Sequence, residues 1–145
     1  MNESTSNNTD QQRETTRLLR SRGITPTAQR VKIASAMFAR PQHLTAEQVL
    51  DLTNESGRKV SKATIYNTLG LFSRKGLIRE LIVDSSRSFY DSSTHRHHHF
   101  YNPETQELSD IPEQEIGIPM PEHLPEGTEV DRVEVVIHLK SKNNS

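Results

Sequence analysis

Residues 60–91, VSKATIYNTLGLFSRKGLIRELIVDSSRSFYD, contain the pattern that decides the fold. Ser61 is a typical helix N-cap, because its hydroxyl oxygen can accept a hydrogen bond from a free backbone N–H of the first turn. A helix is therefore predicted from there to about Arg74. The apolar residues at helical spacing that form its buried stripe are Ile65, Leu69 and Phe72. Two β-rich runs follow, at 77–83 and 88–91, and the segment DSS between them favours a turn.

The opposite face of this predicted helix is polar and open to close approach. Its residues are Lys62, Ala63, Tyr66, Asn67 and Gly70. Helical patterns at 27–40 and 45–53 precede it, and Arg87 lies near the tip of the hairpin. Three short helices and a hairpin are the order of elements in a winged helix, whose last helix enters the DNA major groove. The alternative is a small helical domain with an ordinary polar surface.

The two ends of the chain differ from this middle part. Residues 1–12 are polar, which predicts a flexible N-terminal arm, and a short basic helix is expected at 13–22. Strand-like runs follow the hairpin at 100–101 and 107–111, and the last run is VDRVEVVIHL, at 130–139. This last run alternates, so it predicts a strand with one buried face. The residues expected on that face are Val133, Val135 and Ile137.

The predicted fold class is α+β, with a winged-helix DNA-binding domain at 13–92 and a small α/β domain at 93–145. A sheet as small as the one expected in the second domain has little core of its own and leaves strand edges to cover. Pairing with a second copy of the chain solves this problem, so a dimerisation domain and a homodimer are expected.

Charge is divided unequally along the 145 residues, whose formal net charge is −1. Residues 1–80 carry thirteen Lys and Arg against seven Asp and Glu, whereas 81–145 carry five against twelve. A basic half suits phosphate backbones and an acidic half suits a cation, although the division can also be solubilised surface. The absence of cysteine excludes disulfides, and no run resembles a secretory or membrane segment, so a cytoplasmic protein without a membrane partner is expected.

A histidine tract, HRHHH, occupies residues 95–99. In an extended segment, residues two apart share a face, so His97 and His99 can point at one ion while His98 points away. The alternatives are a solvated surface tract, a pH-sensitive patch and an expression tag. A tag is normally terminal and uninterrupted, and this tract is neither.

Taken together, the motifs resemble the Fur (ferric uptake regulator) superfamily of metal-responsive transcription regulators. The matching segments are GITPTAQR, HLTAEQVL, VSKATIYNTL, SFYD, HRHHHFY and ELSDI, in the order and spacing of the family. Within the superfamily, ATIYNTL, the HHH tract before aromatic residues and MPEHLPEGTEVDRVEVVIHLKSK are most similar to the Irr branch, the iron response regulators that sense haem. The resemblance implies a repressor of iron and haem homeostasis genes that binds a palindromic double-stranded DNA operator as a homodimer.

The resemblance also implies a regulatory metal site that draws ligands from both predicted domains. The ligands that it carries over are His43, Asp91, His97, His99 and Asp110. Three neutral imidazoles and two carboxylates suit Fe²⁺, Mn²⁺ or Zn²⁺. One such ion would fix the angle between the domains, and that angle decides whether both recognition helices of a dimer can enter the groove.

For DNA, the resemblance implies that Tyr66 packs on thymine methyl groups and that Arg30 and Lys62 hold phosphates. Asn67 stands where many relatives carry arginine, so the operator sequence is left open. The full expected set of DNA-binding residues is Arg30, Lys62, Ala63, Thr64, Tyr66, Asn67 and Arg87.

The sequence departs from many relatives in its cysteines. The first of the family's CxxC pairs falls at Asn102 and Thr105, so no structural zinc held by four cysteines is expected. The Cys-Pro haem motif of some relatives is also missing, so haem would have to be held by imidazoles such as that of His98. His98 and Asp131 match positions of a secondary metal site of the superfamily.

Two other function classes stay open. A metal-buffering protein needs only the histidine tract, and a metalloenzyme without DNA binding could use the same histidines and carboxylates. No general base or apolar substrate pocket is signalled, and one expected ligand lies far upstream, beside a DNA-binding helix. A protein that is not an enzyme is therefore expected.

Overall fold

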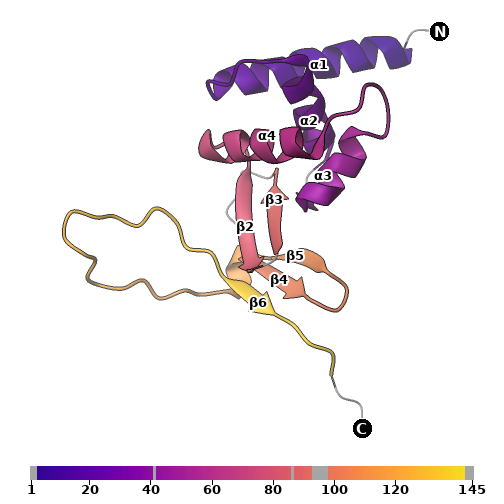
Figure 1. Cartoon of the computed structure of the whole chain (residues 1–145). Helices are drawn as coiled ribbons and strands as arrows, with labels where there is room; N and C mark the ends of the chain where they lie inside the picture. The colour runs from indigo at the N-terminus through magenta and orange to yellow at the C-terminus, as the bar shows by residue number, and fades with distance from the viewer. Residues whose placement is uncertain (1–2, 41, 86, 93–97, 143–145) are drawn as a thin grey trace. The chain divides into compact units, whose positions relative to one another are not determined.

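A computed structural model describes residues 3–40, 42–85, 87–92 and 98–142. The chain divides into two compact units, Met1–Thr94 and His95–Ser145, called here the N-terminal and C-terminal units (Figure 1). Helices followed by a hairpin make up the first unit and strands dominate the second, which confirms the predicted α+β class with an N-terminal winged helix. Among the described residues, no helix is long and apolar enough to cross a bilayer.

The helices of the N-terminal unit surround one apolar core. Their bounds are α1 Glu3–Ser21, α2 Ala28–Phe38, α3 Ala46–Thr53 and α4 Lys62–Arg74. The predicted cap of α4 is confirmed, because Ser61 accepts a hydrogen bond from the Thr64 backbone N–H. Helix α3 begins with a capping box formed by Thr45 and Gln48. The predicted stripe of α4 is fully buried. Because burying a large apolar side chain contributes roughly 1.5–3 kcal/mol, this stripe determines which face of α4 is left to solvent.

Helix α1 is longer than the sequence predicts. It begins at Glu3, so it includes most of residues 1–12, which the sequence predicts as a flexible arm, as well as the helix expected at 13–22. A polar segment can extend a helix whose later turns are held by packing, here by the fully buried Leu19. In α2 the buried residues are Ile33, Ala34 and Met37. Val31 and Phe38 are partly buried against the same core.

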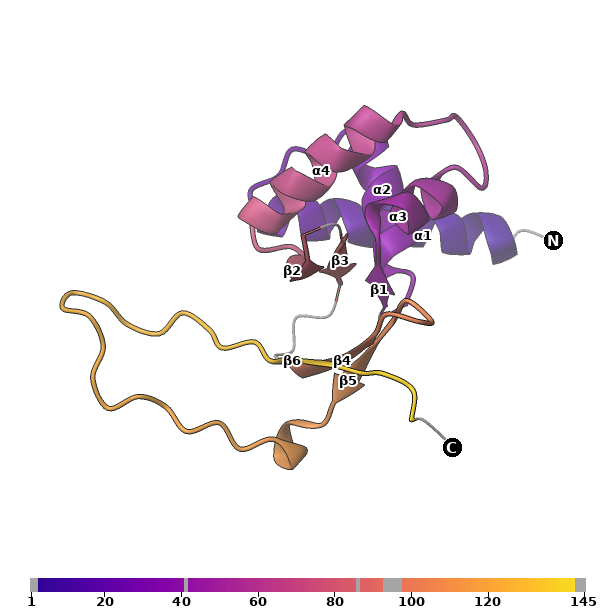
Figure 2. The same cartoon turned by 60° about the horizontal axis from the view of Figure 1, so that its bottom comes forward.

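The sheet of the N-terminal unit is three-stranded and antiparallel. Its strands are β1 His43–Leu44, β2 Arg79–Asp84 and β3 Arg87–Asp91, in the order β1-β3-β2. Strands β2 and β3 form the predicted hairpin, with a register irregularity between Ile82 and Asp84. Strand β1 is absent from the sequence prediction. It pairs with β3 and enters the sheet just before α3 (Figure 2).

The C-terminal unit contains a second three-stranded sheet. Its strands are β4 His98–Asn102, β5 Glu107–Ile111 and β6 Val136–His138, in the order β5-β4-β6, and the 3-10 helix η1 Glu113–Glu115 follows β5. Strand β4 pairs antiparallel with β5 and parallel with β6. The bounds of β5 are those predicted, and β4 extends the predicted run at 100–101.

Strand β6 is shorter and more exposed than the sequence predicts. It takes up only three residues of the alternating run at 130–139. Val133 and Ile137, expected on a buried face, are 37% and 38% exposed, so the prediction of a buried face is wrong for one chain by itself. Alternation shows that one face is apolar but not what covers it, and pairing with β4 covers only an edge of the strand.

Candidate functional site

In the N-terminal unit, His43 and Asp91 face each other across the β1–β3 ladder. They are partners in the strand register, and His43 Nδ1 lies 3.4 Å from Asp91 Oδ2. Residues directly opposite in an antiparallel pair project from the same face, which explains why these two side chains meet. Asp91 is only 3% exposed, and a carboxylate removed from water in this way requires a cation or hydrogen-bond donors beside it.

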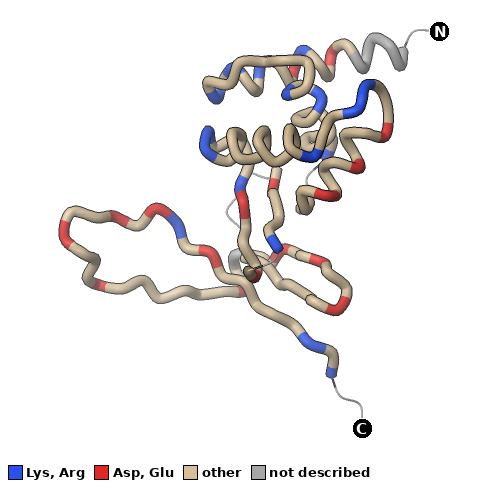
Figure 3. The backbone as a smooth tube through the Cα atoms, in the orientation of Figure 1, with Lys and Arg blue, Asp and Glu red and all other residues tan. Residues whose placement is uncertain are grey.

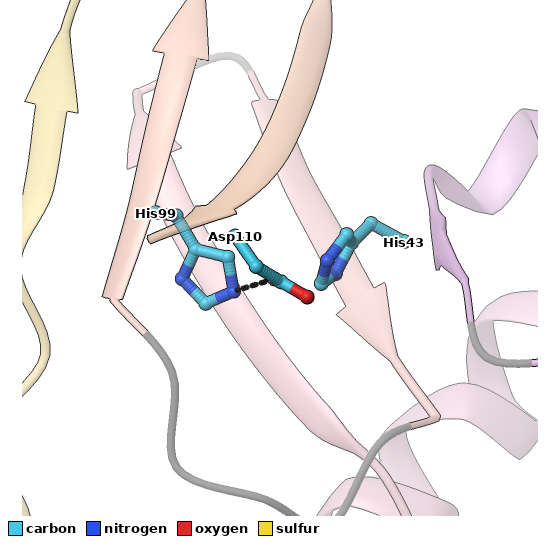
Figure 4. Close-up of side chains that lie close together, drawn as sticks. All are labelled: His43, His99 and Asp110. Carbon is cyan, nitrogen blue, oxygen red and sulfur yellow. Dashed lines mark ion pairs between the residues drawn. The ribbon is translucent and has the colours of Figure 1, made fainter. Parts of the chain in front are cut away.

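The C-terminal unit contains the same arrangement in His99 and Asp110. These residues are partners in the β4–β5 register, and His99 Nε2 lies 3.3 Å from Asp110 Oδ1, the contact drawn as a dashed line in Figure 4. His99 is buried, whereas the Asp110 side chain is 47% exposed. The hairpin register thus holds an imidazole beside a carboxylate that solvent can still reach.

The donor separations in both pairs suit a divalent ion. Imidazole nitrogen and carboxylate oxygen bind such ions at about 2.0–2.2 Å, so two donors 3.3–3.4 Å apart would subtend roughly 105° at a shared ion. This angle lies between the octahedral and tetrahedral values. Each pair can therefore supply two neighbouring positions of a coordination shell with little movement of its side chains.

The other predicted metal residues are placed differently. His97 and the rest of segment 93–97 lie outside the described residues. His98 Nδ1 accepts a hydrogen bond from the Val135 backbone N–H, with an N–N distance of 3.2 Å. Binding a metal or haem through this nitrogen would break one of the hydrogen bonds between β4 and Val135, the residue before β6. Asp131 is an exposed residue of the segment that leads to β6.

The outer face of α4 is open to solvent, as the sequence predicts. Its exposed residues are Lys62, Ala63, Tyr66 and Asn67. Tyr66 is 44% exposed, and Lys62 Nζ lies 5.9 Å from the centroid of its ring in a cation–π contact. Thr64 is only partly exposed, and its hydroxyl oxygen accepts a hydrogen bond from Ser61 Oγ at 2.9 Å. Thr64 therefore contributes to the start of the helix.

The two predicted DNA-binding arginines lie on other elements. Arg30, on α2, donates from Nη1 to the Thr25 carbonyl oxygen at 2.9 Å, and Arg87 begins β3. Figure 3 shows lysine and arginine gathered along the helices of the N-terminal unit, while aspartate and glutamate follow the segment between β5 and β6 in the C-terminal unit. The unequal charge of the sequence is thus divided between the two units.

Sequence reasoning missed one residue of this surface, Glu47. Its Oε1 accepts a hydrogen bond from the Tyr66 hydroxyl at 2.9 Å, so α3 and α4 are linked on the exposed side. A hydrogen bond from its own backbone N–H, at the start of α3, lowers the pKa of Glu47 most, and the Tyr66 hydroxyl and the charges of Lys62 and Arg87 lower it further. The same contact raises the pKa of Tyr66. The capping box placed Glu47 in a first turn, but its contact with α4 depends on the tertiary fold.

Comparison with known proteins places these features in a family. The model of the ferric uptake regulator family matches residues 21–138. The peroxide-responsive repressor PerR of Staphylococcus saprophyticus is 37% identical over 81 residues, which are 56% of this chain. The chain spans only 55% of the length of that relative.

Solved structures agree with the sequence comparison. The ferric uptake regulator of Pseudomonas aeruginosa, determined with manganese, is 26% identical, with a TM-score of 0.67 over 86% of this chain and 95% of the other. The ferric uptake regulator of Vibrio cholerae has a TM-score of 0.68 over 87% and 98% of the two chains, and its 20% identity supports the fold alone.

Proposed function

The chain belongs to the ferric uptake regulator family, and on that premise we propose that it is a metal-responsive DNA-binding regulator of transcription that acts as a homodimer. The observation that carries the proposal is the repeated His–Asp pair. His43 and Asp91 form one pair in the N-terminal unit, and His99 and Asp110 form the other in the C-terminal unit. Each pair has donor atoms at a separation suited to one divalent ion.

We propose that the two pairs, together with His97, bind a single ion. Each pair alone offers two ligands, and two pairs with a further imidazole satisfy a five-coordinate or six-coordinate ion. An ion shared in this way would restrict the angle between the two units. In a dimer, that angle sets the distance between the two α4 helices, which must match half-sites one helical turn apart. Metal affinity and operator affinity are then coupled through one equilibrium.

The proposed ion is divalent and has oxygen and nitrogen ligands, which suits Fe²⁺, Mn²⁺ or Zn²⁺. The related structure from Pseudomonas aeruginosa was determined with manganese. The Irr-like motifs of the sequence favour iron or haem as the physiological signal and repression of iron and haem homeostasis genes as the output. A haem ligand in the described part of the histidine tract would be His99 or His98, and His98 would have to give up its contact with Val135 or use its other nitrogen.

Operator binding is assigned to the exposed face of α4 and to the basic residues near it. Lys62, Arg30 and Arg87 can hold phosphates, and we assign the reading of base edges in the major groove to Tyr66 and Asn67, which are both exposed on α4. The amide of Asn67 offers one donor and one acceptor, which together match N7 and N6 of adenine, so adenine is the base that Asn67 favours.

The homodimer is assigned to the C-terminal unit. Large apolar side chains are at least 37% exposed along the segment that leads into and through β6: Met120, Leu124, Val130, Val133, Ile137 and Leu139. Large exposed apolar residues that recur along one segment suit a protein–protein interface. A two-fold interface formed from this surface would also cover the apolar face that one chain leaves open.

A metal-buffering protein and a metalloenzyme fit the observations less well. Neither role requires a histidine ligand placed next to α3 or a basic outer surface on α4. A metal-buffering protein would bind the ion without any effect on DNA, and an enzyme would turn over a substrate.

Operator binding measured with and without metal tests the proposal. A selected duplex operator is titrated with wild type and with His99→Ala, each in the metal-loaded and the chelator-treated form. His123→Ala serves as a control, because His123 is an exposed histidine outside the pairs. We expect the affinity of wild type and of the control to change with metal, and the change to disappear in His99→Ala. Equal operator affinity with and without bound metal in wild type would overturn the proposed function.

A further inference from the structure

Glu47 is an acidic residue that contacts the outer face of α4, where the exposed residues are basic or neutral. It lies in the first turn of α3, not on α4, and its carboxylate reaches the Tyr66 hydroxyl across the interface between the two helices. A carboxylate beside a DNA-binding face repels phosphates, so it weakens sequence-independent attraction. A carboxylate that weakens DNA attraction in this way is expected to orient a neighbouring side chain or to select a base.

The contacts of Tyr66 show how its ring is held. Its hydroxyl donates to Glu47 Oε1 at 2.9 Å, and Lys62 Nζ lies 5.9 Å from the ring centroid. The ring is therefore fixed from α3 at its hydroxyl end and from the preceding turn of α4 at its face. Because the hydroxyl proton is used by Glu47, the hydroxyl can offer only its lone pairs to a base.

The second oxygen of Glu47 has a defined chemistry toward DNA. A carboxylate accepts hydrogen bonds through both oxygens, and Oε1 takes the proton of Tyr66. In the major groove, carboxylates accept hydrogen bonds from exocyclic amines, which only cytosine N4 and adenine N6 present there. Thymine O4 and guanine O6 are acceptors and would be repelled by the same oxygen.

We propose that Glu47 is a positioning and specificity-determining residue of the DNA interface: it holds the Tyr66 ring through Oε1 and selects a cytosine or adenine amine through Oε2. This proposal rests on the proposed function, because it requires that the outer face of α4 contacts an operator. It adds a base-reading residue on α3 to the set on α4.

Operator selection with three variants tests it. Glu47→Gln keeps an oxygen that can accept from Tyr66 but replaces the second oxygen by an amide donor. We expect Glu47→Gln to shift preference at one base pair of each half-site from an amine-bearing base to thymine or guanine, with about a tenfold change in the ratio of affinities. Glu47→Ala should lose the preference at that pair altogether. Tyr66→Phe, which removes the hydroxyl but keeps the ring, should weaken the preference at the same base pair.

Glu55→Gln is the matched control, because it removes one exposed acidic charge from the connection that follows α3. Any gain in affinity that comes only from reduced repulsion should appear equally in this control. If wild type selects an operator and Glu47→Gln selects the same bases with the same ratios, the role of Glu47 is refuted while the proposed function stands. If wild type selects no sequence, both fail together.

Ultraviolet titration of the tyrosines in the free protein separates positioning from a general effect on folding. The hydrogen bond to Glu47 raises the pKa of Tyr66, so Glu47→Ala should move the pKa of one tyrosine toward its ordinary value while circular dichroism still shows a folded protein. An unchanged tyrosine titration in Glu47→Ala would show that Glu47 does not hold the ring.

Discussion

His43 on β1 lies directly opposite Asp91 on β3, with 3.4 Å between Nδ1 and Oδ2. Strand β1 ends one residue before Thr45, which caps α3, and β3 is the second strand of the hairpin that follows α4. The pair therefore joins the β2–β3 hairpin to the helices of the N-terminal unit. An ion bound there would act on the elements that are proposed to bind DNA.

Asp91→Asn should weaken metal binding by at least about tenfold, since loss of even an outer-shell partner of a metal ligand typically costs that much. Asparagine keeps the size of aspartate and removes its charge. Competition against a metal-binding dye measures the affinity, and Asp51→Asn, an exposed aspartate on α3, is the control. Wild-type metal affinity in Asp91→Asn would exclude this residue from the site.

Phe72→Ala should lower the free energy of unfolding by about 3–5 kcal/mol, because it opens a cavity where the side chain is fully buried. Ile82→Ala, at a position that is 67% exposed, should change it by less than about 0.5 kcal/mol. Urea unfolding followed by circular dichroism measures both. Equal effects of the two substitutions would contradict the assignment of the buried face of α4.

Glu47 is expected to contribute to the stability of the protein at neutral pH and to lose this contribution in acid. Its pKa lies below the ordinary value of 4.5, chiefly through the hydrogen bond from its own backbone N–H. A group whose pKa is lowered in the folded state stabilises the protein at pH values above its ordinary pKa. This contribution is lost as the pH falls through the pKa of the folded state. The difference in thermal midpoint between wild type and Glu47→Gln should therefore be constant above about pH 5 and shrink below pH 4.5. A difference that stays constant down to pH 3 would contradict it.

Ile137→Asp should convert the proposed homodimer to a monomer, because it puts a charge into the apolar surface assigned to the interface. Ile82→Asp places the same charge on an exposed position of the N-terminal unit and should leave the dimer intact. Sedimentation velocity distinguishes the two species. A stable dimer in Ile137→Asp would move the interface to another surface.

Much of the N-terminal unit could be predicted from the sequence because its signals are local. Ser61 and Thr45 begin helices through contacts within four residues, and the stripe ending at Phe72 needs only helical spacing. Strand β1 has two residues, too few for alternation to be visible, and its pairing depends on β3. Glu47 was missed for a similar reason, because its partner Tyr66 lies on another helix.

The candidate metal residues could be named from the resemblance, and the structure adds their geometry within each unit. The register explains the pairing of His99 with Asp110, which spacing along the chain does not show. For Val133 the sequence said less than the structure: the alternation of residues 130–139 indicated an apolar face but not the partner that would cover it. The union of both pairs around one ion is still a prediction.

Metal stoichiometry and affinity in a double-mutant cycle test that union most directly. Manganese or zinc binding is measured by calorimetry for wild type, Asp91→Asn, Asp110→Asn and the double variant. A shared ion predicts one binding event with one ion per chain, and either substitution should weaken this event. The loss of binding free energy in the double variant should be smaller than the sum of the losses in the two single variants. Two separate events, each abolished by only one of the substitutions, would contradict a shared ion.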